Sequence, residues 1–303
     1  MTTNLRERGP DRLKWLLVSL LLTGIWECEK KPRTHSGFIS IADSKIYYNR
    51  TGQGDPVILL HGGLMNTGMW DDQVTFLSRD FTVITVDMRG HGRTVDGDSS
   101  YYMHEAIRIL ADTLSLADFY IVGHSIGGQV ATDFALDYPE YVKGLILESP
   151  SIGQFEGSVP DPELENKILL MQKALIAEKD TVTAANLYVQ AWFDGPSRPQ
   201  SELDSIKRQK ALEMALGTLK THKFKHWPRT SSNLVSSRLK NLRVPVLLIE
   251  GESDFVSLHR IADSLQTLVP GLQRQVIKNA AHMSNLERSS EFNEVLSRFM
   301  KSN

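Results

Sequence analysis

Short apolar runs alternate with helical patterns along most of the chain. The apolar runs are rich in β-branched and aromatic residues and are followed by Gly or polar residues, which is typical of strands. They span Val57–Leu60, Thr82–Val86, Asp118–Val122, Val142–Leu147, Val246–Ile249 and Gln275–Ile277, with helical patterns over His104–Leu114, Leu258–Leu268 and Glu291–Met300. Runs without polar alternation favour a parallel sheet that is covered on both faces. The alternation therefore predicts an α/β protein with a doubly wound, mostly parallel sheet.

Two strand-like runs before these strands are separated by only two turn-forming residues. Phe38–Ala42 and Lys45–Asn49 flank Asp43-Ser44, and this spacing predicts a β-hairpin. We expect the hairpin to form the antiparallel edge of the sheet. The polar stretch Lys30–Gly37 predicts a linker before it.

The strand pattern stops between Ser151 and about Asn241 and resumes afterwards. Helical patterns fill the gap, over Leu164–Glu178, Val182–Trp192 and Leu203–Leu219. We therefore predict a helical cap at residues 151–240, inserted into a core formed by residues 35–150 and 241–303. The cap is expected over the carboxyl ends of the strands, where ligands bind on such sheets.

The N-terminal residues have a different composition from the rest of the chain. A stretch with Arg6, Arg8, Arg12 and Lys14 precedes the charge-free run Trp15–Trp26. This layout is typical of a secretory signal and is short for a membrane span. Cys28 follows as in a bacterial lipoprotein, although residues 25–27 lack the small side chains of a lipidation signal. We expect residues 1–34 to be a signal or anchor segment with a linker, and favour an exported or membrane-tethered protein over a cytoplasmic one.

Composition excludes several classes of partner. The chain has 303 residues, of which 41% are hydrophobic, so it can bury a sizeable core. A net charge of −2 gives no basic surface for nucleic acid. The single cysteine excludes an intrachain disulfide, and no His, Asp or Glu cluster has metal-ligand spacing. We therefore predict no nucleic-acid partner and no metal or cofactor, while the oligomeric state stays open.

One serine lies where a predicted strand turns directly into a predicted helix. Gly123-His-Ser125-Ile-Gly127 fits the pattern G-x-S-x-G, whose small flanking residues permit a sharp elbow that exposes the hydroxyl. The backbone N–H of Ile126 and the start of the helix face the same space, so an anion formed there would meet free donors. The pattern predicts Ser125 as a nucleophile.

A serine nucleophile needs a base, and the base needs an orienting group. His282 follows the last predicted strand among small residues and is the predicted base. Asp254, after the strand Val246–Ile249, is the favoured orienting acid because a single helix separates its strand from that of His282. Glu148 and Glu252 are the alternative acids.

Taken together, the motifs of this chain resemble those of the α/β-hydrolase superfamily, in particular its carboxylesterase-like and enol-lactonase-like members. The resemblance rests on His61-Gly-Gly63, Asp87-x-Arg89-Gly-x-Gly92, the elbow at Ser125, Gly251-Glu-Ser-Asp254 and Ala281-His282, and covers nearly all of Gly37–Phe299 except the cap. It implies Ser125 as nucleophile, His282 as general base and Asp254 as orienting carboxylate. It also implies that the N–H groups of Gly63 and Ile126 form the oxyanion hole.

Other residues of these motifs have less specific roles. Four of them are candidates for the substrate pocket: His124, Trp192, Phe193 and Trp227. His124 could instead only shape the elbow, and the three aromatic residues could instead form the core of the cap. We expect His61, His91, Asp87 and Arg89 to brace loops.

The resemblance implies a serine hydrolase that cleaves a small ester, lactone or thioester through an acyl-enzyme. A perhydrolase or acyltransferase with the same triad is one alternative. A non-catalytic ligand receptor on the same fold is the other. The dehalogenases and epoxide hydrolases of this superfamily have an Asp at the elbow. Ser125 at that position therefore disfavours these two activities for this chain.

Overall fold

The computed structural model describes Met1 and residues 33–152, 161–222, 226–231 and 235–303. The predicted export segment and Cys28 lie outside the described residues, so the predictions made for them stay predictions. Within the described ranges, no helix is long and apolar enough to cross a membrane.

Eight strands form one sheet in the order β1-β2-β4-β3-β5-β6-β7-β8. The strands are β1 Thr34–Ile41, β2 Ser44–Thr51, β3 Pro56–Leu60, β4 Thr82–Asp87, β5 Phe119–His124, β6 Val142–Glu148, β7 Val246–Gly251 and β8 Gln273–Ile277. Strand β2 is antiparallel to β1 and β4, and all other neighbours are parallel. The predicted doubly wound, mostly parallel sheet with a hairpin at its edge is confirmed.

The hairpin begins earlier than its sequence pattern indicates. Thr34 already pairs with Thr51, so the second half of the predicted linker belongs to strand β1. Residues Thr34–Ser36 are exposed, and a strand segment with both faces in solvent carries no apolar pattern. The backbone ladder holds it, together with side-chain hydrogen bonds of Thr34 with Thr51 and of Ser36 with Asn49, and composition reveals neither.

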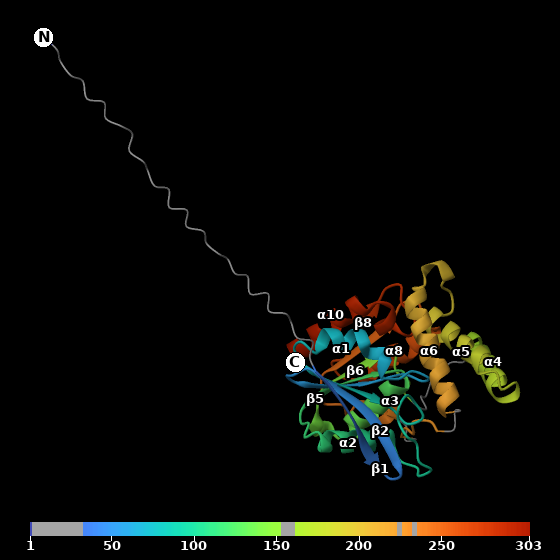
Figure 1. Cartoon of the computed structure of the whole chain (residues 1–303), viewed down its shortest axis with the longest axis horizontal. Helices are drawn as coiled ribbons and strands as arrows, with labels where there is room; N and C mark the ends of the chain where they lie inside the picture. The colour runs from blue at the N-terminus through green and yellow to red at the C-terminus, as the bar shows by residue number, and fades with distance from the viewer. Residues whose placement is uncertain (2–32, 153–160, 223–225, 232–234) are drawn as a thin grey trace. The chain divides into compact units, whose positions relative to one another are not determined.

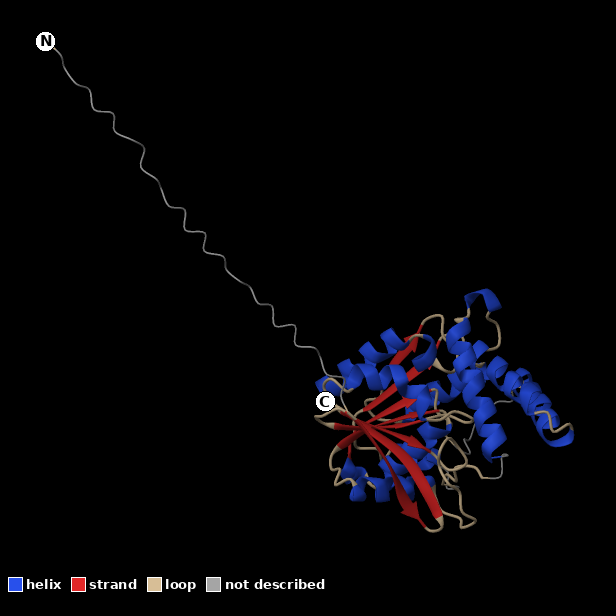
Figure 2. Ribbon diagram, in the orientation of Figure 1, coloured by secondary structure: helices blue, strands red, loops and turns tan. Residues whose placement is uncertain are grey.

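Helices cover both faces of the sheet (Figure 1, Figure 2). Helices α1 (Asp71–Leu77) and α10 (Ser289–Ser302) lie on one face, and α2 (Met103–Thr113), α3 (Ile126–Asp137) and α8 (Val256–Leu268) lie on the other. In β3, Val57 and Leu59 pack into the hydrophobic core on the side of α1 and α10, while Ile58 and Leu60 pack into the core on the side of α2, α3 and α8. Because successive side chains of a strand point to opposite faces, both sets must be apolar. This explains the uninterrupted apolar runs.

The remaining helices are short connections or fill the gap between β6 and β7. The connections are η1 Thr67–Trp70, η2 Pro139–Tyr141 and α9 Ser284–Glu287. The gap contains α4 Pro162–Gln172, η3 Lys173–Ala177, α5 Thr181–Val189, η4 Gln190–Asp194, η5 Gln200–Glu202, α6 Ser205–His222 and α7 Val235–Leu239. We call residues 161–222 the inserted helices. Helices α4, α5 and α6 lie beyond the carboxyl ends of the parallel strands (Figure 2).

Candidate active site

Ser125 lies on the turn between β5 and α3 in a strained conformation. Its φ of 53° and ψ of −118° are rarely adopted by a residue with a side chain. The two flanking glycines permit this turn, since a Cβ on Gly123 would lie 2.2 Å from the Gly127 carbonyl oxygen and one on Gly127 would lie 2.4 Å from the Leu60 carbonyl oxygen. The elbow inferred from the sequence is therefore formed, and the Ser125 side chain remains partly exposed.

His282 and Asp254 meet on neighbouring loops. Strands β7 and β8 are paired with α8 between them, and each loop follows one of these strands. The His282 Nδ1 lies 2.8 Å from the Asp254 Oδ2, and both side chains are buried. Because a carboxylate can only accept, Nδ1 carries the proton of this contact, and in the neutral ring Nε2 is then the acceptor. Nε2 is buried and has no hydrogen-bond partner among the described residues.

The two alternative carboxylates make other contacts. Glu148 is fully buried, and its Oε1 accepts hydrogen bonds of 2.7 Å from both the Ser284 hydroxyl and the Asn285 N–H. It therefore holds the segment that follows His282 rather than the ring itself. Glu252 is exposed and accepts a hydrogen bond from the Asn279 N–H. Of the three candidates, Asp254 is the one that contacts the imidazole.

The predicted oxyanion donors belong to two segments beside the elbow. Ile126 is the first residue of α3, where backbone N–H groups have no intrahelical partner. Gly63 lies three residues after the end of β3. The Tyr188 hydroxyl of α5 donates to the Gly63 carbonyl oxygen, and the His91 Nε2 accepts a 3.2 Å hydrogen bond from the Leu64 N–H. The peptide that follows Gly63 is thus fixed at both its oxygen and its N–H.

Two buried histidines brace this loop in their neutral form. His61 accepts a 3.0 Å hydrogen bond from the Met88 N–H at Nε2, and its Nδ1 lies 2.7 Å from the Gly62 carbonyl oxygen. Burial lowers the pKa of His61 to about 4 and that of His91 to about 3. Both rings are therefore uncharged at neutral pH and can accept from a backbone N–H. Their contacts agree with the bracing role expected from the sequence.

Comparison with known proteins places these features in a family. The family model described as alpha/beta hydrolase fold matches residues 55–289. The chain belongs to this family. The resemblance seen in the sequence motifs is confirmed, and so is the prediction that the protein is a hydrolase.

Several relatives of this α/β hydrolase have named activities. Pimeloyl-[acyl-carrier protein] methyl ester esterase of Nitrosomonas europaea is 29% identical over 82% of this chain and 97% of the relative. 2-Hydroxy-6-oxo-6-phenylhexa-2,4-dienoate hydrolase of Comamonas testosteroni is 27% identical over 86% of this chain and 93% of the relative. The solved structure of carboxylesterase CesB (YbfK) from Bacillus subtilis has a TM-score of 0.73 and 23% identity, and the match covers 89% of this chain and 93% of that one. This last likeness shows the fold alone.

A cavity of about 380 Å³ joins the catalytic candidates of the hydrolase to the inserted helices. Its lining includes Ser125 and His282 from the core, Ile168, Met171, Tyr188 and Trp192 from the inserted helices, and Trp227, Leu258 and Ile261. The Trp192 ring centroid lies 4.5 Å from that of His282. Trp227 lies against Gly63, where an added Cβ would come within 2.9 Å of the indole.

Two of the four expected pocket residues lie elsewhere. Phe193 is fully buried in the hydrophobic core that includes α5 and α6, and it is not part of the cavity lining. Consecutive residues on a helical turn point in different directions, so Trp192 faces the cavity while Phe193 faces the core. His124 is also fully buried, with its ring centroid 4.7 Å from that of His282. Burial lowers the pKa of His124, which favours its neutral form.

Tyr188 is a site residue that the sequence analysis missed. It lines the cavity and also bonds to the Gly63 carbonyl oxygen. A usable signal existed, because Tyr188 precedes Trp192 by four positions in a helical pattern. Residues four apart lie on the same face of a helix.

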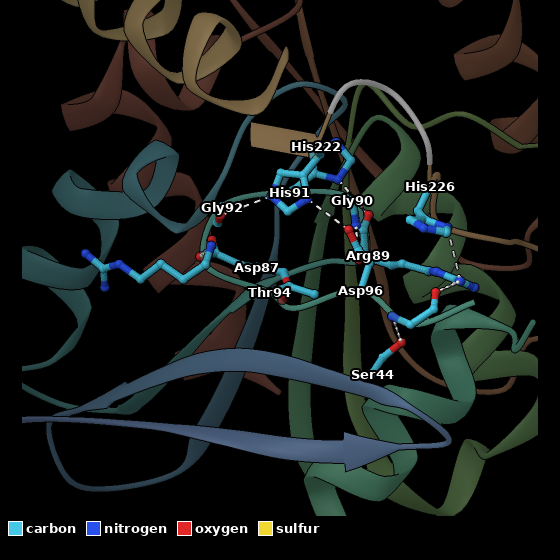
Figure 3. A network of polar contacts seen from close by, with 12 residues as sticks. Ser44, Asp87, Arg89, Gly90, His91, Gly92, Thr94, Asp96, His222 and His226 are labelled. Carbon is cyan, nitrogen blue, oxygen red and sulfur yellow. Dashed lines mark hydrogen bonds and ion pairs between the residues drawn. The ribbon is translucent and has the colours of Figure 1, made fainter. Parts of the chain in front are cut away.

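A second group of polar contacts attaches α6 to the loop after β4 (Figure 3). The Asp87 carboxylate accepts hydrogen bonds from the N–H groups of Thr67 and Arg93, at 2.6 and 2.9 Å. The His222 Nδ1 lies 2.9 Å from the Asp96 Oδ2, and its Nε2 lies 3.1 Å from the Gly92 carbonyl oxygen.

Arg89 completes this loop network. Its guanidinium donates to the Gly97 carbonyl oxygen at 2.8 Å and lies 3.3 Å from the His226 Nδ1. In the part of the chain that the structure describes, no group of three His, Cys, Asp or Glu is arranged to hold a metal ion.

Proposed function

We propose that the protein is a serine hydrolase that cleaves small esters, lactones or thioesters through an acyl-enzyme on Ser125. The observation that carries the proposal is the state of His282. Its Nδ1 is held by Asp254, while its Nε2 has no partner among the described residues and the ring lines the same cavity as Ser125. A neutral imidazole held in this way is suited to accept the proton of a serine hydroxyl.

In the proposed reaction, the Ser125 oxygen attacks the carbonyl carbon of the substrate while its proton passes to the His282 Nε2. The N–H groups of Gly63 and Ile126 stabilise the negative oxygen of the tetrahedral intermediate. The imidazolium then protonates the leaving group, and the acyl-enzyme remains. Water then gives a proton to Nε2 and attacks the acyl carbon. The imidazolium returns this proton to the Ser125 oxygen as the bond between that oxygen and the acyl carbon breaks, which releases the acid and restores Ser125. Asp254 stabilises the imidazolium in both steps.

Among the described residues, the Ser125 hydroxyl and the His282 Nε2 do not form a hydrogen bond. Such bonds are often loose without substrate and tighten in the complex, so the absence is compatible with the proposed roles. The lining of the cavity is mostly apolar, which favours an uncharged substrate with an apolar acyl or alcohol group. The named esterases and hydrolases among the relatives support ester hydrolysis.

The proposal is tested with a fluorophosphonate label and a short-chain p-nitrophenyl ester. We expect the label on Ser125, and we expect Ser125→Ala to lose the label and at least about 10³-fold in kcat. Ser264→Ala, on the exposed face of α8, is the matched control. Labelling of another serine would contradict the assignment. Ester binding without turnover would favour a receptor, and faster acyl transfer to peroxide or an alcohol than to water would favour the other enzyme classes.

A further inference from the structure

A buried ion pair joins the inserted helices to the loop that carries His282. Arg198 follows η4, and Glu287 is the last residue of α9. Only 6% of the Arg198 side chain and 5% of the Glu287 side chain are exposed, and the Arg198 Nη1 contacts the Glu287 Oε2. Burial of two charges is costly unless their remaining donors and acceptors are satisfied. The other contacts of the pair therefore show what it holds.

Arg198 bridges two backbone segments with a single planar group. Its Nη2 donates to the Phe193 carbonyl oxygen and its Nε to that of Asp194, at 3.0 Å for the latter. These are the last two residues of η4, where carbonyl groups have no intrahelical partner and a cation is favourable. The Nη1 also donates to the Asn279 carbonyl oxygen at 3.1 Å, in the loop before His282. A lysine ammonium could not reach these oxygens together.

Glu287 extends the bridge to the residue next to His282. Its Oε1 accepts a 2.8 Å hydrogen bond from the Ala281 N–H. Burial raises the pKa of Glu287 to about 7, although the Arg198 guanidinium acts in the opposite direction. The pair thus fixes the backbone of the loop that carries His282, which we call the catalytic loop, at Asn279 and at Ala281.

At its other end, the bridge holds helix η4, which carries a residue of the cavity lining. Helix η4 carries Trp192, whose ring lies against His282. The turn after η4 packs against the two loops that carry Asp254 and His282. A Cβ on Gly195 would lie 2.8 Å from the Ser253 carbonyl oxygen and 2.9 Å from the Ala281 Cβ. Movement of η4 would therefore shift Trp192 and disturb the loops that carry Asp254 and His282.

We propose that Arg198 and Glu287 are positioning residues for the hydrolytic reaction. They fix His282 and Trp192 relative to each other, so that the inserted helices and the catalytic loop hold one geometry. Neither side chain lines the cavity, and both act through backbone groups. The inference rests on the proposed function of Ser125 and His282.

The chain offers a matched control in a second ion pair on the same helix. The Asp194 carboxylate binds Arg208 of α6 through two nitrogens, at 2.8 and 3.0 Å. Both side chains are largely buried, and this pair joins η4 to α6 without involving the catalytic loop in any described contact. Its loss should destabilise the inserted helices, but the contacts of Arg198 should still hold η4 against the loop that carries His282, so His282 should stay in place.

The experiment compares Arg198→Met, Glu287→Gln, the double variant and Arg208→Met, with Arg198→Lys as a milder change. We expect kcat and the rate of fluorophosphonate labelling to fall roughly 10- to 100-fold in Arg198→Met, with a smaller change in KM, because small misplacements of catalytic groups are costly. Arg208→Met should keep kcat within about threefold, because the described side-chain contacts of Arg208 go to Asp194 and not to the loop that carries His282. The double variant should recover thermal stability lost by Arg198→Met, since no unpaired charge remains, but should not recover kcat.

Recovery of kcat together with stability in the double variant would overturn the positioning role. So would an equal loss of kcat in Arg208→Met at an equal loss of stability. If Arg198→Met does not fold, Arg198→Lys carries the test, with a kcat loss at nearly unchanged stability supporting the role and full activity overturning it. Wild-type protein without turnover or labelling would instead overturn the proposed function, a result distinct from active wild type with unaffected variants.

Discussion

The strand-end loops and the inserted helices contribute to the same cavity but are held in place by different interactions. The loops are fixed largely by backbone hydrogen bonds, such as those from the Ser125 N–H to the Glu148 oxygen and from the Ser253 N–H to the Ala280 oxygen. Buried side chains of the core, such as His91 and Glu148, add to these bonds. The inserted helices reach the core through side chains, among them Tyr188, Arg198 and His222. A single substitution can remove a side-chain contact, whereas a backbone contact survives most substitutions.

This difference separates chemistry from specificity. The nucleophile, base and oxyanion donors proposed here belong to the loops, and their positions follow from the sheet. The shape of the cavity depends on Trp192 and Tyr188, which belong to the inserted helices. The inserted segment can therefore change without loss of the reaction, provided that its contacts with the catalytic loops are kept. The following substitutions test this division, from the largest expected effect to the smallest.

Within the strand-end loops, Asp254 should matter more for turnover than Glu148. We expect Asp254→Asn to lower kcat by roughly 10²–10⁴ with little change in KM, because the imidazole loses its tautomer and the imidazolium its counter-charge. Glu148→Gln should cost less than about tenfold, since Glu148 contacts Ser284 and Asn285 rather than the ring. Steady-state kinetics on purified variants measures both.

Circular dichroism of each variant is the control for misfolding. The reverse ranking in folded variants would transfer the orienting role to Glu148. Equal large losses would show that the two carboxylates act together on His282.

Between the two regions, Tyr188 makes the contact that bears most directly on the oxyanion donors. Tyr188→Phe removes the donor to the Gly63 carbonyl oxygen and leaves that oxygen without its partner. We expect kcat to fall roughly threefold to thirtyfold, less than for Asp254→Asn, because the Leu64 N–H remains held by His91. Tyr141→Phe, which removes an exposed hydroxyl bound to Asp112, is the matched control. Unchanged kcat in Tyr188→Phe would show that the loop holds its shape without the inserted helices.

The same division decides what the sequence could predict. Strands β3 to β7 were recognisable because both of their faces are buried, and Ser125 because its turn requires glycines at fixed positions. His282 and Asp254 were found because each follows a strand. Such signals are local, and local spacing is visible in a sequence.

The contacts of the inserted helices are not local. Arg198 pairs with Glu287 and Tyr188 with Gly63 across long stretches of chain, and no spacing rule connects these positions. The placement of Phe193 also escaped prediction, because it depends on the rotation of η4 against the core. The start of β1 was also not predictable, because its residues are exposed and therefore form no apolar pattern.

The smallest effect on turnover is expected from His222, which attaches the end of α6 to the loop after β4 (Figure 3). Both ring nitrogens face acceptors, the Asp96 carboxylate and the Gly92 carbonyl oxygen, and only the imidazolium can donate to both. The hydrogen bond to Asp96 raises the pKa of His222 above its ordinary value of 6.5. The side chain is 6% exposed, so solvent does little to replace a lost bond.

Because the pKa is higher in the folded state, the contact stabilises the protein fully below about pH 6.5 and is lost as the pH rises through the folded-state pKa of His222. We expect His222→Gln to lower the free energy of unfolding by about 1–3 kcal/mol at pH 6 and by less at pH 9, with kcat within about twofold. Thermal and urea denaturation across this range measures the effect. His35→Gln, on the exposed start of β1, is the control and should leave the pH dependence unchanged. An equal loss of stability at both pH values would mean that His222 acts by packing alone, and a large loss of kcat would mean that α6 also holds the catalytic loops.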